Sequence, residues 1–172
     1  MKNMFEEARK KYRPKSVKYL LIAEAPPQEK SRRFFYYENV KDQDSLFLET
    51  MKVLYPTKYT DAKTVRANKI IFLRQFMADG FYLLDAASSP IIDTRKKRHQ
   101  ISSDFPGLLK RIDEVICKNT KIILISRPVY DVCYEELKNK GYKVINAEMV
   151  DFPGSSGQKN YRNKMQKLLK SV

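Results

Sequence analysis

Several residue types on which whole structural classes depend are scarce in this sequence. Its 172 residues include two cysteines, Cys117 and Cys133, one histidine, five glycines and no tryptophan. Two cysteines cannot build a disulfide framework or an all-cysteine zinc site, so we expect reduced thiols and a cytoplasmic protein. The low glycine content and a hydrophobic fraction of 42% exclude collagen-like and intrinsically disordered chains.

Long hydrophobic runs are also absent. The longest, such as residues 19–23, are far shorter than the roughly 20 residues of a membrane-spanning helix. Residues 2–11 are highly charged rather than apolar, so we expect no signal peptide. The glycine-rich motifs of P-loop and dinucleotide-binding proteins do not occur. We therefore predict one domain over residues 1–172, monomeric, without a cofactor and without a membrane partner.

Positive charge dominates the sequence. It has 34 Lys and Arg against 20 Asp and Glu, a net charge of +14. Residues 95–98 form a continuous basic run, and residues 159–170 carry basic side chains with no acidic one. Each phosphate that a cation neutralises releases a condensed counterion, so this chain favours polyanionic partners. We predict that it binds DNA, single- or double-stranded; the alternative is a solvated, lysine-rich surface.

Four short apolar segments predict β-strands: residues 18–24, 81–86, 121–126 and 142–146. Their hydrophobic residues are consecutive rather than alternating, which is typical of parallel strands buried on both faces. Helical periodicity appears around residues 4–12, 47–54, 72–77, 108–116, 129–137 and 161–169, with Pro106 expected in a first helical turn. This alternation predicts an α/β fold, a three-layer α/β/α sandwich with a four-stranded parallel sheet.

Polar residues follow these strands at the edge where parallel sheets bind ligands. Glu24 follows the first strand, Asp85 lies in the second, Arg127 follows the third and Asn146 ends the fourth. We predict that Glu24 and Asp85 form part of an active site. The alternative is that Glu24 caps the next element and Asp85 is a solvated strand end. His99 lies in the basic segment, which we expect to be a loop, without other metal-ligating residues beside it, so no metal site is predicted.

Two further segments are candidate ligand-binding loops. Residues 154–157, Gly-Ser-Ser-Gly, precede the last helix, where small residues allow close backbone approach and a helix N-terminus attracts anions. The alternative is a plain turn with Ser156 as the helix N-cap. Phe34 and Phe35 follow two arginines and are candidates for stacking on bases, although the same residues would serve equally in a core.

Three segments, in this order, resemble motifs of the uracil-DNA glycosylase superfamily. Residues 21–27, Leu-Ile-Ala-Glu-Ala-Pro-Pro, resemble its first motif, an apolar strand that runs into Gly-Glu-x-Pro-Gly. Residues 81–87 resemble its middle strand, which ends in a base-reading Asn, and residues 151–156 stand where the family has a late His-Pro-Ser loop. The order and spacing agree over about the whole chain, which looks closest to a poorly characterised branch.

The resemblance implies an enzyme of base excision repair that extrudes a damaged or deaminated base and hydrolyses its N-glycosidic bond without a metal. Glu24 matches the carboxylate that stabilises positive charge on the sugar and orients water, and Asp85 matches the base-reading position. The residues then expected to contact the base or the DNA are Pro26, Phe34, Phe35, Arg95, Lys96, Lys97, Arg98, Arg127, Phe152, Pro153, Gly154, Ser155 and Ser156.

The chain departs from the family at identifiable positions. Phe152 replaces the late-loop histidine, which removes a donor for the departing base, and Asp85 replaces the base-reading Asn. The cysteines of the iron–sulfur branches are missing, so no cluster is expected. Two other functions stay open. One is a non-catalytic nucleic-acid-binding protein on the same fold; the other is a Mg²⁺-dependent nuclease or phosphohydrolase using Glu24, Asp85 and Asp93 or Asp151.

Overall fold

Three parallel strands lie at the centre of the computed structural model, which describes residues 3–154 and 156–171. β1 (Val17–Ala23) is the middle strand, β2 (Phe81–Asp85) lies on one side of it and β3 (Ile116–Leu124) on the other. The register pairs Ala23 with Asp85 and Ile22 with Leu124. The carboxyl ends of all three strands therefore meet at one edge of an open sheet.

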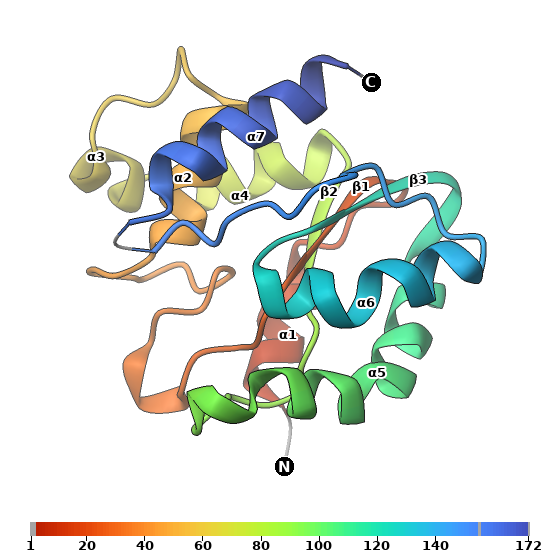
Figure 1. Cartoon of the computed structure of the whole chain (residues 1–172). Coiled ribbons are helices and arrows are strands. Elements are labelled where there is room, and N and C mark those ends of the chain that lie inside the picture. The colour runs from red at the N-terminus through yellow and green to blue at the C-terminus, as the bar shows by residue number, and fades with distance from the viewer. Residues whose placement is uncertain (1–2, 155, 172) are drawn as a thin grey trace.

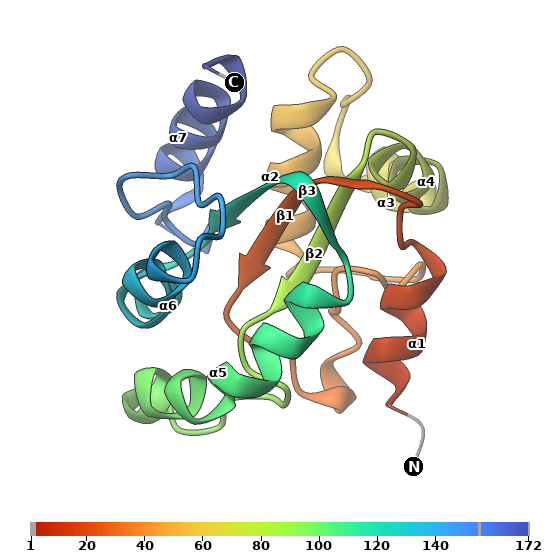
Figure 2. The same ribbon diagram turned by 90° about the vertical axis from the view of Figure 1, so that its right-hand side faces the viewer.

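Helices cover both sides of this sheet (Figures 1 and 2). α5 packs against α6 on one side, and α2 packs against α7 on the other. The helices are α1 (Met4–Lys11), α2 (Ser45–Leu54), α3 (Ala62–Ala67), α4 (Lys69–Ala78), α5 (Lys97–Asp113), α6 (Arg127–Asn139) and α7 (Gln158–Lys170), with 3₁₀ turns at Glu29–Ser31 and Thr94–Lys96. Across the described residues, none of these helices is long and apolar enough to cross a membrane.

Burial along the strands follows the consecutive hydrophobic pattern. Every residue of β2 is buried, as are Leu20–Ala23 in β1 and the last three residues of β3. The prediction of an α/β fold built on parallel strands is confirmed in this respect. Because both faces of the strands are covered by helices, no alternation between polar and apolar residues is needed.

The sheet has three strands in the described residues, not the predicted four. Residues 142–146 make only an isolated parallel bridge between Val144 and Ile122, and Val150 makes another with Ile125. Between the two bridges, it is the Asn146 side chain, and not the main chain, that forms hydrogen bonds with β3. The Leu124 N–H donates to Asn146 Oδ1 (2.9 Å), and Asn146 Nδ2 donates to the Leu124 carbonyl (3.0 Å). Asn146 is therefore a buried structural residue that satisfies main-chain groups of β3 which no neighbouring strand pairs.

The helix predicted to begin near Pro106 begins at Lys97 instead, so Pro106 lies inside α5. A proline in a helix leaves the carbonyl four residues earlier without its partner, and here both Ser102 and Pro106 are exposed. Water can satisfy a carbonyl on that side of the helix. The segment that contains Lys97, Arg98 and His99 is consequently the first turn of a helix and not part of a loop.

The outer edge of β2 is closed by a tyrosine. The Leu83 N–H donates to the Tyr36 hydroxyl (2.7 Å), and that hydroxyl donates to the Leu83 carbonyl (3.3 Å). Burial raises the pKa of Tyr36 well above its ordinary value. The hydroxyl therefore stays protonated and serves both bonds, which protects the strand edge from pairing with another chain.

Lys69, the first residue of α4, is buried in the same region and only 1% exposed. Its ammonium lies 4.3 Å from the centre of the Phe47 ring and 3.5 Å from the Phe34 carbonyl oxygen. Burial lowers the pKa of Lys69 to about 7, although the nearby Asp44 carboxylate opposes that effect. The fold thus carries a desolvated cation whose charge is lost near neutral pH.

Replacing this cation with an uncharged side chain of similar length should stabilise the fold. We expect Lys69→Met to raise the free energy of unfolding at pH 7. Above pH 7 the unfolded chain still binds the lysine proton and the folded chain does not, so wild-type stability rises with pH by at most about 1.4 kcal/mol per pH unit. Urea unfolding between pH 7 and pH 10 should show the advantage of the variant shrinking; a constant difference would contradict the burial of a titrating ammonium.

Candidate active site

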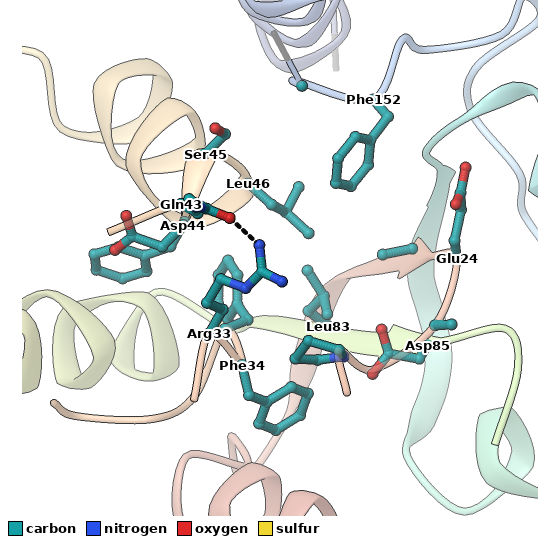
Figure 3. A pocket seen from close by; sticks show the side chains of 16 residues that line it. Glu24, Arg33, Phe34, Gln43, Asp44, Ser45, Leu46, Leu83, Asp85 and Phe152 are labelled. Carbon is teal, nitrogen blue, oxygen red and sulfur yellow. Dashed lines mark hydrogen bonds between the residues drawn. The ribbon is translucent and has the colours of Figure 1, made fainter. Parts of the chain in front are cut away.

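A cavity of about 560 Å³ opens at the carboxyl ends of β1 and β2 (Figure 3). Its walls come from these strand ends, from residues 25–35, from the start of α2 and from the loop before α7. This volume lies within the range of small-ligand sites, and the position is where open parallel sheets bind ligands.

Six of the residues predicted from the sequence line this cavity: Glu24, Phe34, Phe35, Asp85, Phe152 and Gly154. Pro26 and Pro153 are buried beside it without lining it, Ser156 is exposed, and Arg127 is exposed at the start of α6. Ser155 lies outside the described residues. The N-cap of α7 is Gly157, so Ser156 does not cap that helix.

Asp85 lies on the floor of the cavity and is 4% exposed. Its Oδ2 accepts a hydrogen bond from Arg9 Nη2 at 2.6 Å, and Arg9 Nη1 donates to Glu6. Burial raises the pKa of Asp85, while the Arg9 guanidinium opposes this by stabilising the carboxylate. Asp85 is thus a buried, ion-paired group and not the solvated strand end of the alternative interpretation.

Helix α1 supplies this guanidinium by means of a simple amphipathic pattern. Phe5 and Arg9 are one turn apart and are the two buried residues of the helix. The Phe5 ring packs edge-on against Phe34 (4.9 Å between centres), and the Arg9 guanidinium carbon lies 5.3 Å from the centre of the same ring. Asn3 caps the helix by accepting from the Phe5 N–H at 3.1 Å. The docking of α1 therefore depends on both an aromatic contact and an ion pair.

Glu24 lies at the rim of the cavity and pairs with the basic run. Lys97 Nζ lies 2.9 Å from Glu24 Oε2. The other paired cations of this run contact different carboxylates: Arg98 lies 2.7 Å from Asp131, and Arg95 lies 3.1 Å from Asp93. The run predicted to bind DNA therefore borders the site, with part of its charge balanced by acidic neighbours.

The loop before α7 brings Phe152 over the cavity. The Phe152 side chain is 42% exposed, and Figure 3 shows its ring facing Leu46 across the opening. Gly157 permits this loop, because a Cβ at that position would lie 2.2 Å from the Phe152 carbonyl oxygen. Helix α7 anchors the loop to α2 through a hydrogen bond between Tyr161 and Thr50 (2.7 Å).

Sequence reasoning noted Arg33 only as one of the arginines before the aromatic residues, and it missed Gln43, Asp44 and Ser45, which also line the cavity. Arg33 Nη1 donates to Gln43 Oε1, and Figure 3 shows the guanidinium pointing into the cavity. Gln43 has a left-handed backbone (φ 52°) just before α2. The Arg-Phe-Phe sequence was a signal for Arg33, since it directly precedes predicted aromatic residues. Nothing local in the sequence marks Gln43.

Ser126 has an unusual backbone at the end of β3. Its φ of 82° and ψ of 153° fall in a region that residues other than glycine rarely adopt, and its buried Oγ has no hydrogen-bond partner among the described residues. The Ser126 N–H donates to the Val150 carbonyl (2.7 Å), which holds this strained residue beside the broken edge of the sheet. The geometry turns the chain sharply into α6, and Ser126 does not line the cavity.

The carboxylates considered as Mg²⁺ ligands do not converge. Glu24 pairs with Lys97, Asp85 with Arg9 and Asp93 with Arg95, and Asp151 lies 2.9 Å from Lys164. Among residues 3–154 and 156–171, no three His, Cys, Asp or Glu side chains are grouped as a metal would require. Each of these acids is therefore balanced by a side chain of the protein.

Comparison with known proteins assigns neither a family nor a function to the chain. No protein-family model matches the chain, and no curated protein is significantly similar to it. The functional argument accordingly rests on the geometry of the cavity and on the chemistry of its walls.

Removing the Arg9 guanidinium should weaken the fold strongly. In Arg9→Met the Asp85 carboxylate stays buried without its partner, a situation that costs about 3–5 kcal/mol. Urea unfolding at pH 7 measures this loss, and the exposed Arg13→Met substitution in the segment that follows α1 serves as the control. A loss below about 1 kcal/mol would mean that Asp85 does not depend on Arg9.

Proposed function

We propose that this protein is a DNA glycosylase of the uracil-DNA glycosylase type, which hydrolyses the N-glycosidic bond of a damaged or deaminated base without a metal. The observation that carries the proposal is the cavity at the strand ends, with Glu24 at the rim, Asp85 on the floor and aromatic rings in the walls. A base extruded from DNA needs such an enclosed, partly aromatic pocket.

Glu24 is the proposed catalytic carboxylate. As the base departs, the sugar acquires positive charge, which a nearby carboxylate stabilises while it orients the attacking water. In the free protein Lys97 lies against Glu24. DNA phosphates compete for Lys97, so the approach of the backbone is expected to release Glu24 for the sugar.

Asp85 is the proposed base-reading residue. A carboxylate held by Arg9 only accepts hydrogen bonds, so it favours a base edge that presents N–H donors over one that presents carbonyl oxygens. This chemistry suits a cytosine or guanine derivative better than uracil. Phe34 and Phe152 are the rings against which the base would stack, with Phe152 the accessible one. Gly154 and its neighbours would approach the backbone.

One observation favours a second candidate, a non-catalytic nucleic-acid-binding protein. Phe152 offers no hydrogen-bond donor where a glycosylase of this type uses a histidine against the charge on the departing base. The Mg²⁺-dependent nuclease is not favoured, because each of its proposed ligands is paired with a cation of the protein.

The substitution Glu24→Gln separates the two functions. We expect excision to fall by at least about 100-fold, since removing a preorganised charge from a transition state has effects of that order. DNA binding should be unchanged or tighter, because a negative charge that faces the backbone is lost. The measurement is alkali-labile cleavage, in EDTA, of labelled oligonucleotides that carry uracil, hypoxanthine, xanthine, mismatched thymine or a normal base.

The matched control is Glu29→Gln, which makes the same change at an exposed carboxylate of the following 3₁₀ turn. It should cleave like the wild type. Absence of breaks with every substrate in the wild type, together with DNA binding, would reject the glycosylase and leave the binding protein.

Binding to DNA should depend strongly on salt. We expect a plot of log K against log[salt] to have a slope steeper than about −2, as when three or more phosphates are contacted. Lys96→Glu should lower the affinity without changing the preference among bases, because phosphate contacts carry no sequence information. Fluorescence anisotropy at several salt concentrations measures both. A slope near zero would exclude the basic surface as the binding site.

A further inference from the structure

A second cavity, of about 680 Å³, lies between residues 30–42 and the start of α4. Six basic residues line it, Lys30, Arg32, Arg33, Lys41, Arg66 and Lys69, against two acidic ones, Glu38 and Asp42. Arg33 belongs to the walls of both cavities. The concentration of positive charge in a recess of this kind attracts an anion more strongly than the same charges on a flat surface.

Lys69 is the unusual member of this set, because its side chain is buried while its charge is not balanced. Its Nζ donates to the Phe34 carbonyl at 3.5 Å, which is a long hydrogen bond for an ammonium. The neighbouring carboxylate, Asp44, is engaged by Arg66, whose Nε and Nη2 donate to Asp44 Oδ1 at 2.9 and 2.6 Å. Among the residues that the structure describes, no carboxylate forms an ion pair with Lys69.

The start of α4 directly follows the end of α3. Lys69 is the first residue of α4, and Asn68, the N-cap residue, makes no side-chain capping hydrogen bond. Asn68 is also the C-cap of α3, and its carbonyl accepts from the Ile71 and Phe72 N–H groups, so the attraction for an anion comes from side chains. A bound anion would meet Lys69 and the Arg66 guanidinium, whose Nη1 is not used by Asp44.

We propose that the cavity around Lys69 is a phosphate-binding site, in which Lys69 and Arg66 supply positive charge beside the basic residues of segment 30–41. A phosphate fits this set better than a carboxylate, because its oxygens can accept from several donors that approach from three chain segments. The same chemistry has two possible sources. One is a backbone phosphate of a DNA strand whose base enters the first cavity, and the other is the phosphate of a free ion or mononucleotide.

The test compares wild-type protein, Lys69→Met and Lys140→Met by isothermal titration calorimetry at constant ionic strength. Lys69→Met keeps the side-chain length, removes the charge and is expected to fold with higher stability, so lost binding cannot be ascribed to unfolding. Lys140 follows α6 and is exposed, and its replacement makes the same change in net charge outside the cavity. The ligands are an eight-residue oligothymidine without terminal phosphates, and inorganic phosphate.

A strand phosphate in the cavity should lower the affinity of Lys69→Met for the oligothymidine by at least about fivefold and reduce the salt slope by about 0.7, with Lys140→Met close to wild type. If Lys69→Met loses only the binding of inorganic phosphate, the phosphate-binding site is supported and its ligand is a free phosphate. Equal affinities of wild type and Lys69→Met for both ligands would overturn the proposal. Because the readout is binding, these results hold for a protein without glycosylase activity.

Proton uptake gives an independent readout. Asp44 and Arg66 face Lys69 with opposite effects on its pKa, and burial leaves that pKa at about 7. A bound phosphate favours the charged lysine, so at pH 8 the protein should take up close to one proton per oligothymidine, seen as a dependence of the enthalpy on the buffer. Phosphodiesters do not titrate in this range. Binding of the oligothymidine without uptake in the wild type, or with equal uptake in Lys69→Met, would overturn the role of Lys69.

Discussion

The buried ion pair between Arg9 and Asp85 joins the parts of the molecule on which the site depends. Asp85 ends the edge strand β2, and Arg9 comes from the first helix, 76 residues earlier in the chain. The pair fixes α1 against the aromatic cluster around Phe34 and at the same time places an acceptor on the cavity floor. A charge pair of this kind contributes little net stability compared with apolar packing, yet losing one member is costly. The role of the pair in the site therefore follows from its position at the cavity and not from its net contribution to stability.

The charged groups around the two cavities are paired in ways that the binding of a polyanion would change. Glu24 is held by Lys97, and Asp85 is held by Arg9, whereas Lys69 is buried without an ion-pair partner among the described residues. Under the two proposals, a polyanion would separate Lys97 from Glu24 and would supply the negatively charged partner that Lys69 lacks. Arg33 lines both cavities, so the two proposals place their ligands next to each other. The two proposals remain separable because only the first requires catalysis.

The local pattern predicted β1, β2 and the end of β3 because consecutive apolar residues in a short segment have few other stable arrangements. It failed at residues 142–146, where Asn146 binds β3 with its side chain and so interrupts the ladder that the apolar residues suggest. It also failed at Pro106, since a proline is tolerated inside a helix where the freed carbonyl faces water. Helix α3 was missed, although Asp61, which accepts from the Thr64 N–H, is an N-cap signal visible in the sequence.

The sequence by itself determined the parallel α/β arrangement, the basic character and the position of Glu24 and Asp85 at one edge, because strand hydrophobicity and net charge are properties of local composition. Only the tertiary structure decided which side chains share a cavity. Phe34 is nearly buried and still lines the site, Gln43 enters it through a left-handed turn, and Lys69 loses contact with water. Burial and charge pairing arise from residues far apart in the chain, and the same lysine in the same helix would be an exposed cation if its neighbours packed differently.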